Sequence, residues 1–385
     1  MPYKAYKFRL DPTTSQREQL GSIAGSCRFI FNHFLAIQKD LYTQRKETNN
    51  PDIKFLSYNQ TSSLLTQMKH EEATSWLQQP PNHSLQQSLM DLDRAIKSWL
   101  TKKTGFPKFK KLGLHDSIRF PVAPVVNQDT KQIKLPKLGW IRYRKSREVT
   151  GIVKSATISR EGHHWFISIL TEHSENLDPH PNQSGIGIDV GVTHFLTLSS
   201  GEHIDLPKLD HLVARITSLQ QRLSHKQKGS KNRKKAQHRL SVAHRKLRHV
   251  RHDFLHKTST HLAKNHSYIV MEDLKVTNMM RSAKGTKEKP GRYVKQKAGL
   301  NRSIAQQAWS TFRNLLAYKL SNLNGELRLV DPRHTSQTCP QCLTTDRRNR
   351  KSQSKFKCIS CGHTANADHN AATNILRLGL LGSVA

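Results

Sequence analysis

The sequence predicts a mixed fold: a β-barrel domain with a helical module inserted in it, followed by an α/β domain with a cysteine-rich insertion. Three observations support this prediction: helical periodicity over residues 13–104, short strand-like segments over residues 105–174, and three closely spaced strands from residue 185 onward. The chain has 385 residues, enough for two or three domains with a sizeable core. Disulfide bonds are therefore not needed for folding.

The composition is strongly basic. Lysine and arginine total 63 against 28 acidic residues, which gives a net charge of +35 and a pI near 10.3. Such a positive field suits a polyanion, and nucleic acid is the first candidate. A membrane surface is the second, but the basic residues are not confined to one amphipathic helix and no apolar run approaches the ~20 residues that span a bilayer. We expect a soluble protein, cytoplasmic and nucleoid-associated, whose binding is sensitive to salt.

The first hundred residues combine one strand with a set of helices. Segment 3–10 alternates like a strand. Apolar residues at helical spacing predict helices around 20–34 and 85–99, and a third helix is expected over 56–68. These helices form the predicted module of residues 13–104.

From Gly105 the pattern changes to short alternating segments separated by turns. The predicted strands are 133–135, 140–143, 155–159 and 165–169. This pattern is typical of a β-barrel or a small sheet, and the opening strand could belong to it. Basic and aromatic residues among these segments suit a nucleic-acid surface, although a solvated strand face explains them nearly as well.

After a polar linker over residues 175–184, three strands joined by tight turns are predicted from Gly185 to Leu206. Asp189 lies in the apolar first strand, where a carboxylate is costly unless it is paired or binds a cation. The neighbouring glycines do not form a phosphate loop, because no Gly-Lys-Ser/Thr follows them.

Long helical segments are predicted over residues 208–266, and they contain a dense basic run. Between Arg222 and His252 there are twelve lysines or arginines, five histidines and no acidic residue. A solvated surface is the alternative, but such a run repels itself unless a polyanion lies alongside. We expect contacts with a nucleic-acid backbone that position the ligand without base readout, made by Lys226, Arg233, Lys234, Lys235 and Arg239.

A second acidic residue ends another apolar strand. Segment 267–271 has a strand's length and is followed by Glu272, which repeats the pattern seen at Asp189. Residues 279–302 are expected to be a mobile basic loop, followed by one helix over 303–323 and a strand over 326–330.

Two Cys-x-x-Cys pairs predict a zinc ribbon formed by Cys339, Cys342, Cys358 and Cys361. A disulfide framework is the weaker alternative, because no secretory signal is recognised and the remaining cysteine, Cys27, lies alone in an apolar helical pattern. Four cysteine ligands leave no open coordination position, so one Zn²⁺ ion would be structural.

The ribbon leads into a helix with Asn366 as its expected N-cap and Asp368 in its first turn. Taken alone, Asp368 suits the helix dipole better than it suits catalysis. However, the order of strands, helices and acidic residues is that of the RNase H fold, in which such acids meet at one edge of the sheet. Asp189, Glu272 and Asp368 would then hold two Mg²⁺ or Mn²⁺ ions for phosphodiester hydrolysis.

Eight segments resemble the TnpB family of transposon-encoded RNA-guided DNA endonucleases, which are related to type V CRISPR effectors. They are Cys27–Asn32, Leu85–Ala95, Gly105–Lys110, Gly187–Gly191, Val270–Leu274, the two cysteine pairs and Asp368–Ala372. The resemblance covers nearly the whole chain. It implies a guide RNA derived from the transposon end, a double-stranded DNA target and a short target-adjacent motif, with Tyr58, Ser62 and Gln86 near the reader of that motif. We expect one protein per guide RNA, with no oligomer required.

The resemblance also implies a domain map. A wedge β-barrel comprises residues 1–12 and 105–174, with a helical recognition domain of residues 13–104 inserted in it. A RuvC-like nuclease domain comprises residues 185–334 and 364–385, with the zinc ribbon of residues 335–363 inserted in it. The acidic residues of the RuvC motifs are Asp189, Glu272 and Asp368.

Two alternatives remain from the sequence. The first is a guided DNA-binding repressor that has lost nuclease activity, against which the presence of all three acidic residues argues. The second is a transposase. A single-strand transposase needs a His-hydrophobe-His motif that is absent here, and a ribbon before the last acidic residue argues against a DDE-type enzyme.

Overall fold

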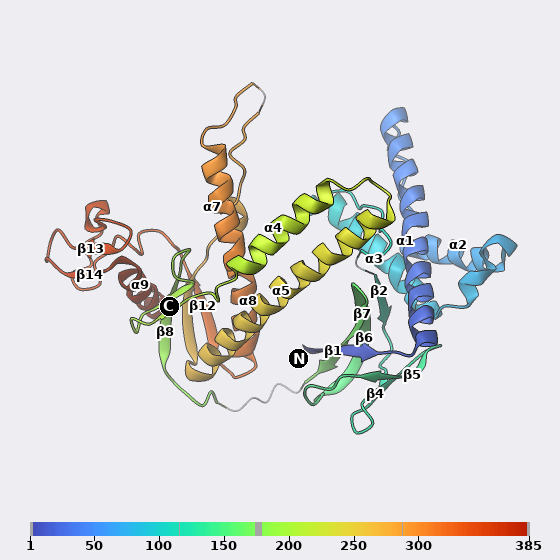
Figure 1. Cartoon of the computed structure of the whole chain (residues 1–385), viewed down its shortest axis with the longest axis horizontal. Coiled ribbons are helices and arrows are strands. Elements are labelled where there is room, and N and C mark those ends of the chain that lie inside the picture. Colours follow the sequence, from blue (N-terminus) through green and yellow to red (C-terminus); the bar gives the residue numbers. More distant parts are fainter. Residues whose placement is uncertain (1–2, 115, 174–178, 287, 383–385) are drawn as a thin grey trace. The chain divides into compact units, whose positions relative to one another are not determined.

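The computed structural model describes residues 3–114, 116–173, 179–286 and 288–382. The chain divides into two compact units, Met1–Glu175 and Asn176–Ala385, and each is described by itself (Figure 1). Residues 175–178 of the predicted linker lie outside the described residues.

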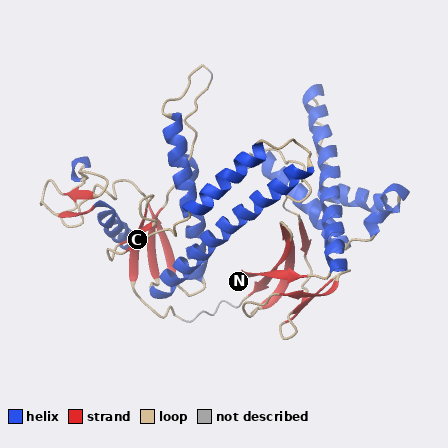
Figure 2. Cartoon of the chain, viewed as in Figure 1, coloured by secondary structure: helices blue, strands red, loops and turns tan. Residues whose placement is uncertain are grey.

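The first unit contains a seven-stranded sheet with the strand order β2-β6-β7-β1-β5-β4-β3. Figure 2 shows strands in red and helices in blue. The strands of this sheet are β1 (Tyr3–Asp11), β2 (Ser117–Phe120), β3 (Val125–Asn127), β4 (Gln132–Leu135), β5 (Gly139–Tyr143), β6 (Ile152–Glu161) and β7 (His164–Glu172). The opening strand β1 pairs antiparallel with both β5 and β7, so it does belong to this sheet. Strands β2 and β3 lie at the two ends of the strand order, and closure into a barrel stays a prediction.

The helices of the first unit all lie between β1 and β2 in the chain. They are α1 (Thr14–Thr48), α2 (Tyr58–His70), the 3₁₀ helix η1 (Glu72–Gln78) and α3 (Asn82–Leu100). Their apolar faces share one core with the sheet, as at Phe34 of α1 and Ile167 of β7, which are both fully buried. The sequence therefore correctly predicted α1, α2 and α3, whereas η1 was not predicted.

Helix α1 is also long and apolar enough to cross a membrane by length and composition. The expectation that no segment approaches this length was therefore too strong. Half of its most apolar window is buried inside the unit, so packing in the core accounts for its apolar face.

The second unit contains a five-stranded sheet with the order β10-β9-β8-β11-β12. Its strands are β8 (Gly185–Val190), β9 (Leu196–Leu198), β10 (His203–Ile204), β11 (Tyr268–Glu272) and β12 (Glu326–Val330). Strands β8, β9 and β10 are antiparallel neighbours, whereas β11 runs parallel to β8 and to β12. Adjacent parallel strands need crossover connections, and long helical segments supply them.

The helices of this unit are α4 (Asp210–Ser224), α5 (Lys231–Asn265), α6 (Val276–Met279), α7 (Val294–Gln307), α8 (Trp309–Ser321) and α9 (Ala367–Leu381). Apolar residues of α5 and α8, among them Leu255 and Phe312, form a core with Ile188 and Met271 on one face of the sheet. Helix α9 packs against β8 on the other face.

Two sequence predictions in this unit were wrong. Residues 279–302 are not one loop, because α6 ends at Met279 and α7 begins at Val294. The predicted helix over 303–323 is instead the end of α7 and the whole of α8, which are separated by Ala308 in a left-handed conformation with φ of 56°. Helical periodicity continues across this single residue, so the pattern could not reveal the break.

A small two-stranded ribbon, β13 (Lys355–Lys357) and β14 (Thr364–Asn366), precedes α9. A short 3₁₀ helix, η2 (Arg347–Asn349), lies between the two cysteine pairs. The ribbon has a small core of its own, formed by Cys339, Phe356, Cys358 and Ala367.

Candidate functional site

The register of two strands places Asp189 beside Glu272. Strands β8 and β11 are parallel, and Ile188 lies opposite Met271. The next residue on each strand is acidic, so the two carboxylates occupy neighbouring positions at the same edge of the sheet. The pattern of one acid near the end of each apolar strand predicted this arrangement.

Helix α9 reaches the same face because two glycines allow close contact. A Cβ atom on Gly187 would lie 2.2 Å from the carbonyl oxygen of Ala372, and one on Gly379 would lie 2.4 Å from a methyl carbon of Val270. Side chains alternate along a strand, so Asp189 points to the same side as Gly187, and Glu272 to the same side as Val270. Both carboxylates therefore face the side that α9 covers.

The start of α9 places the third acidic residue. The side-chain oxygen of Asn366 accepts hydrogen bonds from the backbone N–H groups of Asp368, at 2.9 Å, and His369, at 3.2 Å. Asn366 is thus the N-cap that the sequence predicted, and Asp368 lies in the first turn. Asp368 acts electrostatically on Asp189, so the structure brings all three acidic residues into one neighbourhood.

The carboxylates repel one another in a partly buried setting. Burial, followed by the charges of Glu272 and Asp368, raises the pKa of Asp189 well above its usual value. Burial also raises the pKa of Glu272, although a hydrogen bond from Thr335 and the charge of Arg350 act in the opposite direction. Such a cluster is stabilised by cations.

Arg350 is a site residue that the sequence analysis missed. Its guanidinium lies 3.8 Å from a carboxylate oxygen of Asp368. The positive charge of Arg350 also opposes the rise in the pKa values of Asp189 and Glu272. The residue follows η2 in the ribbon, where it is one of several basic side chains. Only the folded arrangement distinguishes it from them.

Asp273, the other half of the Glu272–Asp273 pair, has different partners. It forms ion pairs with Lys275 and with Arg313, the latter at 3.1 Å. Asp273 lies just beyond the end of β11, and its partner Arg313 belongs to α8, which packs on the face of the sheet opposite α9. The geometry therefore assigns Glu272, rather than Asp273, to the acidic cluster.

The four ribbon cysteines form a second, tighter cluster. One sulfur atom from each lies within 4.8 Å of the others, and all four thiols are free. The Sγ atoms are 3.6 Å apart in the Cys339–Cys361 pair and 3.5 Å apart in the Cys342–Cys358 pair. A disulfide would require about 2.05 Å, whereas the edge of a Zn–S₄ tetrahedron is about 3.8 Å. The cluster can hold one metal ion with a closed ligand shell.

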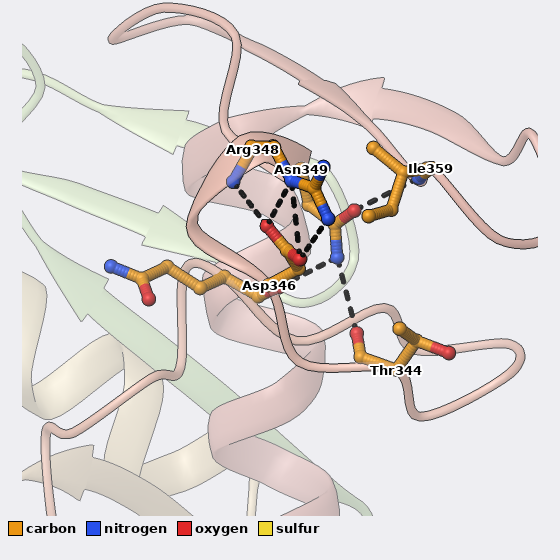
Figure 3. Close-up of polar contacts among 6 residues, drawn as sticks. Thr344, Asp346, Arg348, Asn349 and Ile359 are labelled. Carbon is orange, nitrogen blue, oxygen red and sulfur yellow. Dashed lines mark hydrogen bonds and ion pairs between the residues drawn. The ribbon is translucent and has the colours of Figure 1, made fainter.

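A buried asparagine connects the two cysteine pairs (Figure 3). The side-chain amide of Asn349 donates hydrogen bonds to the carbonyl oxygens of Gln337, at 3.0 Å, and Thr344, at 3.1 Å. Its side-chain oxygen accepts a hydrogen bond from the backbone N–H of Ile359 at 2.9 Å. Asn349 thus joins the backbone around the first pair to the backbone inside the second.

The predicted backbone-binding residues lie around the turn between α4 and α5. A cleft of about 620 Å³ there is lined by Lys226, Lys235 and Arg239, together with Arg222 and His225. Lys234 is exposed nearby on α5. Arg233 differs, because its guanidinium donates to the carbonyl oxygens of Leu223, at 3.0 Å, and Lys226, at 2.7 Å. Its contacts favour a role in closing the helical hairpin.

The residues associated with motif reading lie on two helices of the first unit. Tyr58 begins α2 and lines a groove of about 700 Å³ with Phe55 and Lys97. Ser62 lies one turn later on α2, and Gln86 lies near the start of α3. The structure does not place Ser62 or Gln86 among the residues that line this groove.

Three family models match the chain. They are described as "Probable transposase" over residues 168–283, "Cas12f1-like, TNB domain" over residues 309–375, and "Helix-turn-helix domain" over residues 1–47. The protein named "Putative RNA-guided DNA endonuclease InsQ" from Escherichia coli K12 is 44% identical over 98% of this chain and 92% of its own length. The chain belongs to the TnpB family.

Other TnpB relatives are more distant. A protein of Streptomyces pristinaespiralis, also named as an RNA-guided DNA endonuclease, is 30% identical over 99% of this TnpB chain and 90% of its own length. Among solved structures, the Cas12f1–sgRNA–target DNA complex matches with 18% identity and a TM-score of 0.36, covering 98% of this chain and 99% of that one.

Proposed function

We propose that this TnpB-family protein is an RNA-guided endonuclease that hydrolyses double-stranded DNA complementary to its guide RNA. The relatives at 44% and 30% identity carry that activity in their names. The observation that carries the proposal is the convergence of Asp189, Glu272 and Asp368 from two strands and a helix. Family membership alone would fit a guided repressor equally well, and only the acidic cluster distinguishes the nuclease.

The second unit suits an RNase H-like, RuvC-type nuclease domain. Its sheet has three antiparallel strands followed by two parallel ones, and the acidic residues lie on the first strand, the fourth strand and the last helix. We assign the first unit to a wedge β-barrel with an inserted recognition domain. Tyr58, Ser62 and Gln86 are our candidates there for reading a target-adjacent motif.

The acidic residues fit divalent cations. They provide oxygen ligands, which Mg²⁺ and Mn²⁺ prefer, and burial together with the charges of Glu272 and Asp368 makes the negative charge of Asp189 costly without a cation. Two such ions about 4 Å apart would activate a water molecule and stabilise the leaving oxygen. Arg350, held near Asp368, would add positive charge where a target phosphate enters.

The zinc ligands and the nucleic-acid contacts are assigned from the chemistry of their side chains. We assign Zn²⁺ to the four cysteines, because a closed set of four sulfur ligands is typical of a structural zinc site. We assign Lys226, Lys234, Lys235 and Arg239 to the nucleic-acid backbone. In guided systems base pairing supplies the sequence specificity, so backbone contacts suffice for much of the protein surface.

The proposal is tested by plasmid cleavage with the purified protein, its co-purified RNA and Mg²⁺. The wild type should cut only a plasmid that matches the guide, and Asp189→Ala should reduce cleavage by ~10³-fold, the upper end of the range for losing one electrostatic group in an active site. Target binding should persist. Asp273→Asn is the matched control, because it removes an adjacent carboxylate that faces elsewhere. Undiminished cleavage by Asp189→Ala would overturn the proposal.

A further inference from the structure

Thr335 contacts the acidic cluster from the base of the cysteine ribbon. Its hydroxyl oxygen lies 2.6 Å from Oε1 of Glu272 and 3.2 Å from the carbonyl oxygen of Pro332. The hydroxyl has one proton, and the shorter contact to a carboxylate is the stronger of the two. Thr335 is only 4% exposed, so no bulk water competes for this hydrogen bond.

Helix α9 fixes the backbone of Thr335. The side-chain amide of Asn374 donates hydrogen bonds to the carbonyl oxygens of Thr335, at 2.9 Å, and Thr338, at 2.7 Å. One turn earlier on the helix, Asn370 donates to the same carbonyl of Thr338 at 3.0 Å. Both asparagines are buried at 1% exposure. Buried amide donors with specific acceptors hold this short segment in one conformation.

The same segment continues directly into the cysteine cluster. Thr338 precedes Cys339, and the hydroxyl of Thr338 lies 2.9 Å from that of Thr345 beyond the first cysteine pair. The backbone N–H of Cys339 donates to the carbonyl oxygen of Thr344, which Asn349 also contacts. Residues 335–339 therefore form a continuous backbone segment that begins at the hydrogen bond from Thr335 to Glu272 and ends at the first cysteine of the cluster.

We propose that Thr335 is a positioning residue for Glu272, and that residues 335–339 couple its orientation to metal binding in the cysteine ribbon. This inference rests on the proposed function of Glu272 as a ligand for divalent cations. The hydroxyl holds one carboxylate oxygen, Oε1, and so restricts how the carboxylate can turn. Groups that hydrogen-bond to metal ligands orient them, and their loss typically reduces metal affinity or activity by 10- to 100-fold.

The first test compares Thr335→Val, which keeps the side-chain shape but loses the hydroxyl, with Thr335→Ser, which keeps it. In the full chain bound to its guide RNA, the Mn²⁺ concentration for half-maximal cleavage should rise about 10-fold or more in Thr335→Val. Thr335→Ser should remain close to the wild type. Mn²⁺ binding measured by calorimetry should follow the same order. A Thr335→Val variant with wild-type Mn²⁺ affinity would overturn the positioning role, and so would failure of Thr335→Ser to rescue it.

The second test measures the coupling through the zinc affinity of the ribbon, determined at equilibrium by competition with a zinc-selective chelator. Saturating Mn²⁺ should raise the zinc affinity of the wild type, because the binding free energies of two coupled sites affect each other reciprocally. The increase should disappear in Thr335→Val and in Glu272→Gln. Equal zinc affinity with and without Mn²⁺ in the wild type would overturn the coupling.

The two hypotheses fail in different ways. If Glu272→Gln binds Mn²⁺ as tightly as the wild type, Glu272 is not a cation ligand and the proposed function fails. If Glu272→Gln loses Mn²⁺ binding while Thr335→Val retains it, only the positioning inference fails.

Discussion

The cysteine ribbon and the acidic cluster are two candidate metal sites built in opposite ways. The ribbon takes all four ligands from residues 339–361, and their sulfur atoms lie within 4.8 Å of one another. The acidic cluster takes its proposed ligands from positions 189, 272 and 368, on two strands and one helix. The first site is a property of a short sequence, whereas the second exists only because the sheet and α9 are folded.

This difference matches two chemical tasks. Four thiolates fill a tetrahedral shell and leave no position for a substrate, so the ribbon can only support structure. Three carboxylates would not fill the shells of the two proposed cations, so water and a phosphate could complete them. The cost is electrostatic, and it appears in the raised pKa of Asp189.

The largest expected effect is loss of the ribbon metal. Cys358→Ser removes a buried sulfur ligand, so bound zinc should fall from about one per chain to near zero. Elemental analysis measures this, and hydrogen exchange should show faster exchange across residues 339–361. Cys27→Ser is the matched control, because Cys27 is buried in α1, outside the cluster. Retention of full zinc content by Cys358→Ser would contradict the assignment.

The sequence predicted those parts of both sites that can be recognised within a short stretch of residues. Cysteine spacing identified the ribbon, and an acidic residue at the end of an apolar strand singled out Asp189 and Glu272. Arg350 and Thr335 were not found, because the ribbon contains several arginines and threonines and no spacing rule separates these two. Their significance depends on which side chains the fold brings within reach. Their contacts with Asp368 and Glu272 therefore required the structure.

The next largest effect separates Arg350 from its basic neighbours. Arg350→Gln should reduce the cleavage rate by ~10²-fold, because it removes the positive charge beside Asp368. Arg347→Gln changes an exposed arginine in η2 and should leave the rate within about twofold of the wild type, since surface changes away from such features have small effects. Single-turnover cleavage measures both variants. Equal rates for the two would show that the charge beside Asp368 is not used.

A smaller effect, on zinc affinity, is expected at Asn349, which connects the two cysteine pairs. Asn349→Ala removes three hydrogen bonds that join the two pairs, so zinc affinity should fall about 10-fold. Competition with a chelator of known affinity measures this change. Gln353→Ala, at an exposed ribbon position, is the control and should have no effect. Wild-type affinity in Asn349→Ala would mean that the cysteines alone set the geometry.

The smallest effect is a shift in pH dependence at the acidic cluster. Because the pKa of Asp189 is raised, its carboxylate takes up a proton as the pH falls through that value, and a protonated carboxyl group is a poor cation ligand. Cleavage should therefore decline toward acidic pH. A tenfold increase in Mg²⁺ should move this decline about one pH unit lower, because proton and metal compete for the same group. A decline that ignores Mg²⁺ concentration would point to another titrating group.

The most direct test of the account is the number of Mn²⁺ ions bound by the guide-RNA complex of the wild type and of Asp189→Asn, measured by calorimetry with zinc content determined in parallel. The RNA contributes equally to both complexes, so their difference reports the acidic cluster. We predict that the variant loses one or two Mn²⁺ ions and keeps one zinc ion. Equal Mn²⁺ binding by the two complexes would contradict the claim that Asp189, Glu272 and Asp368 share divalent cations.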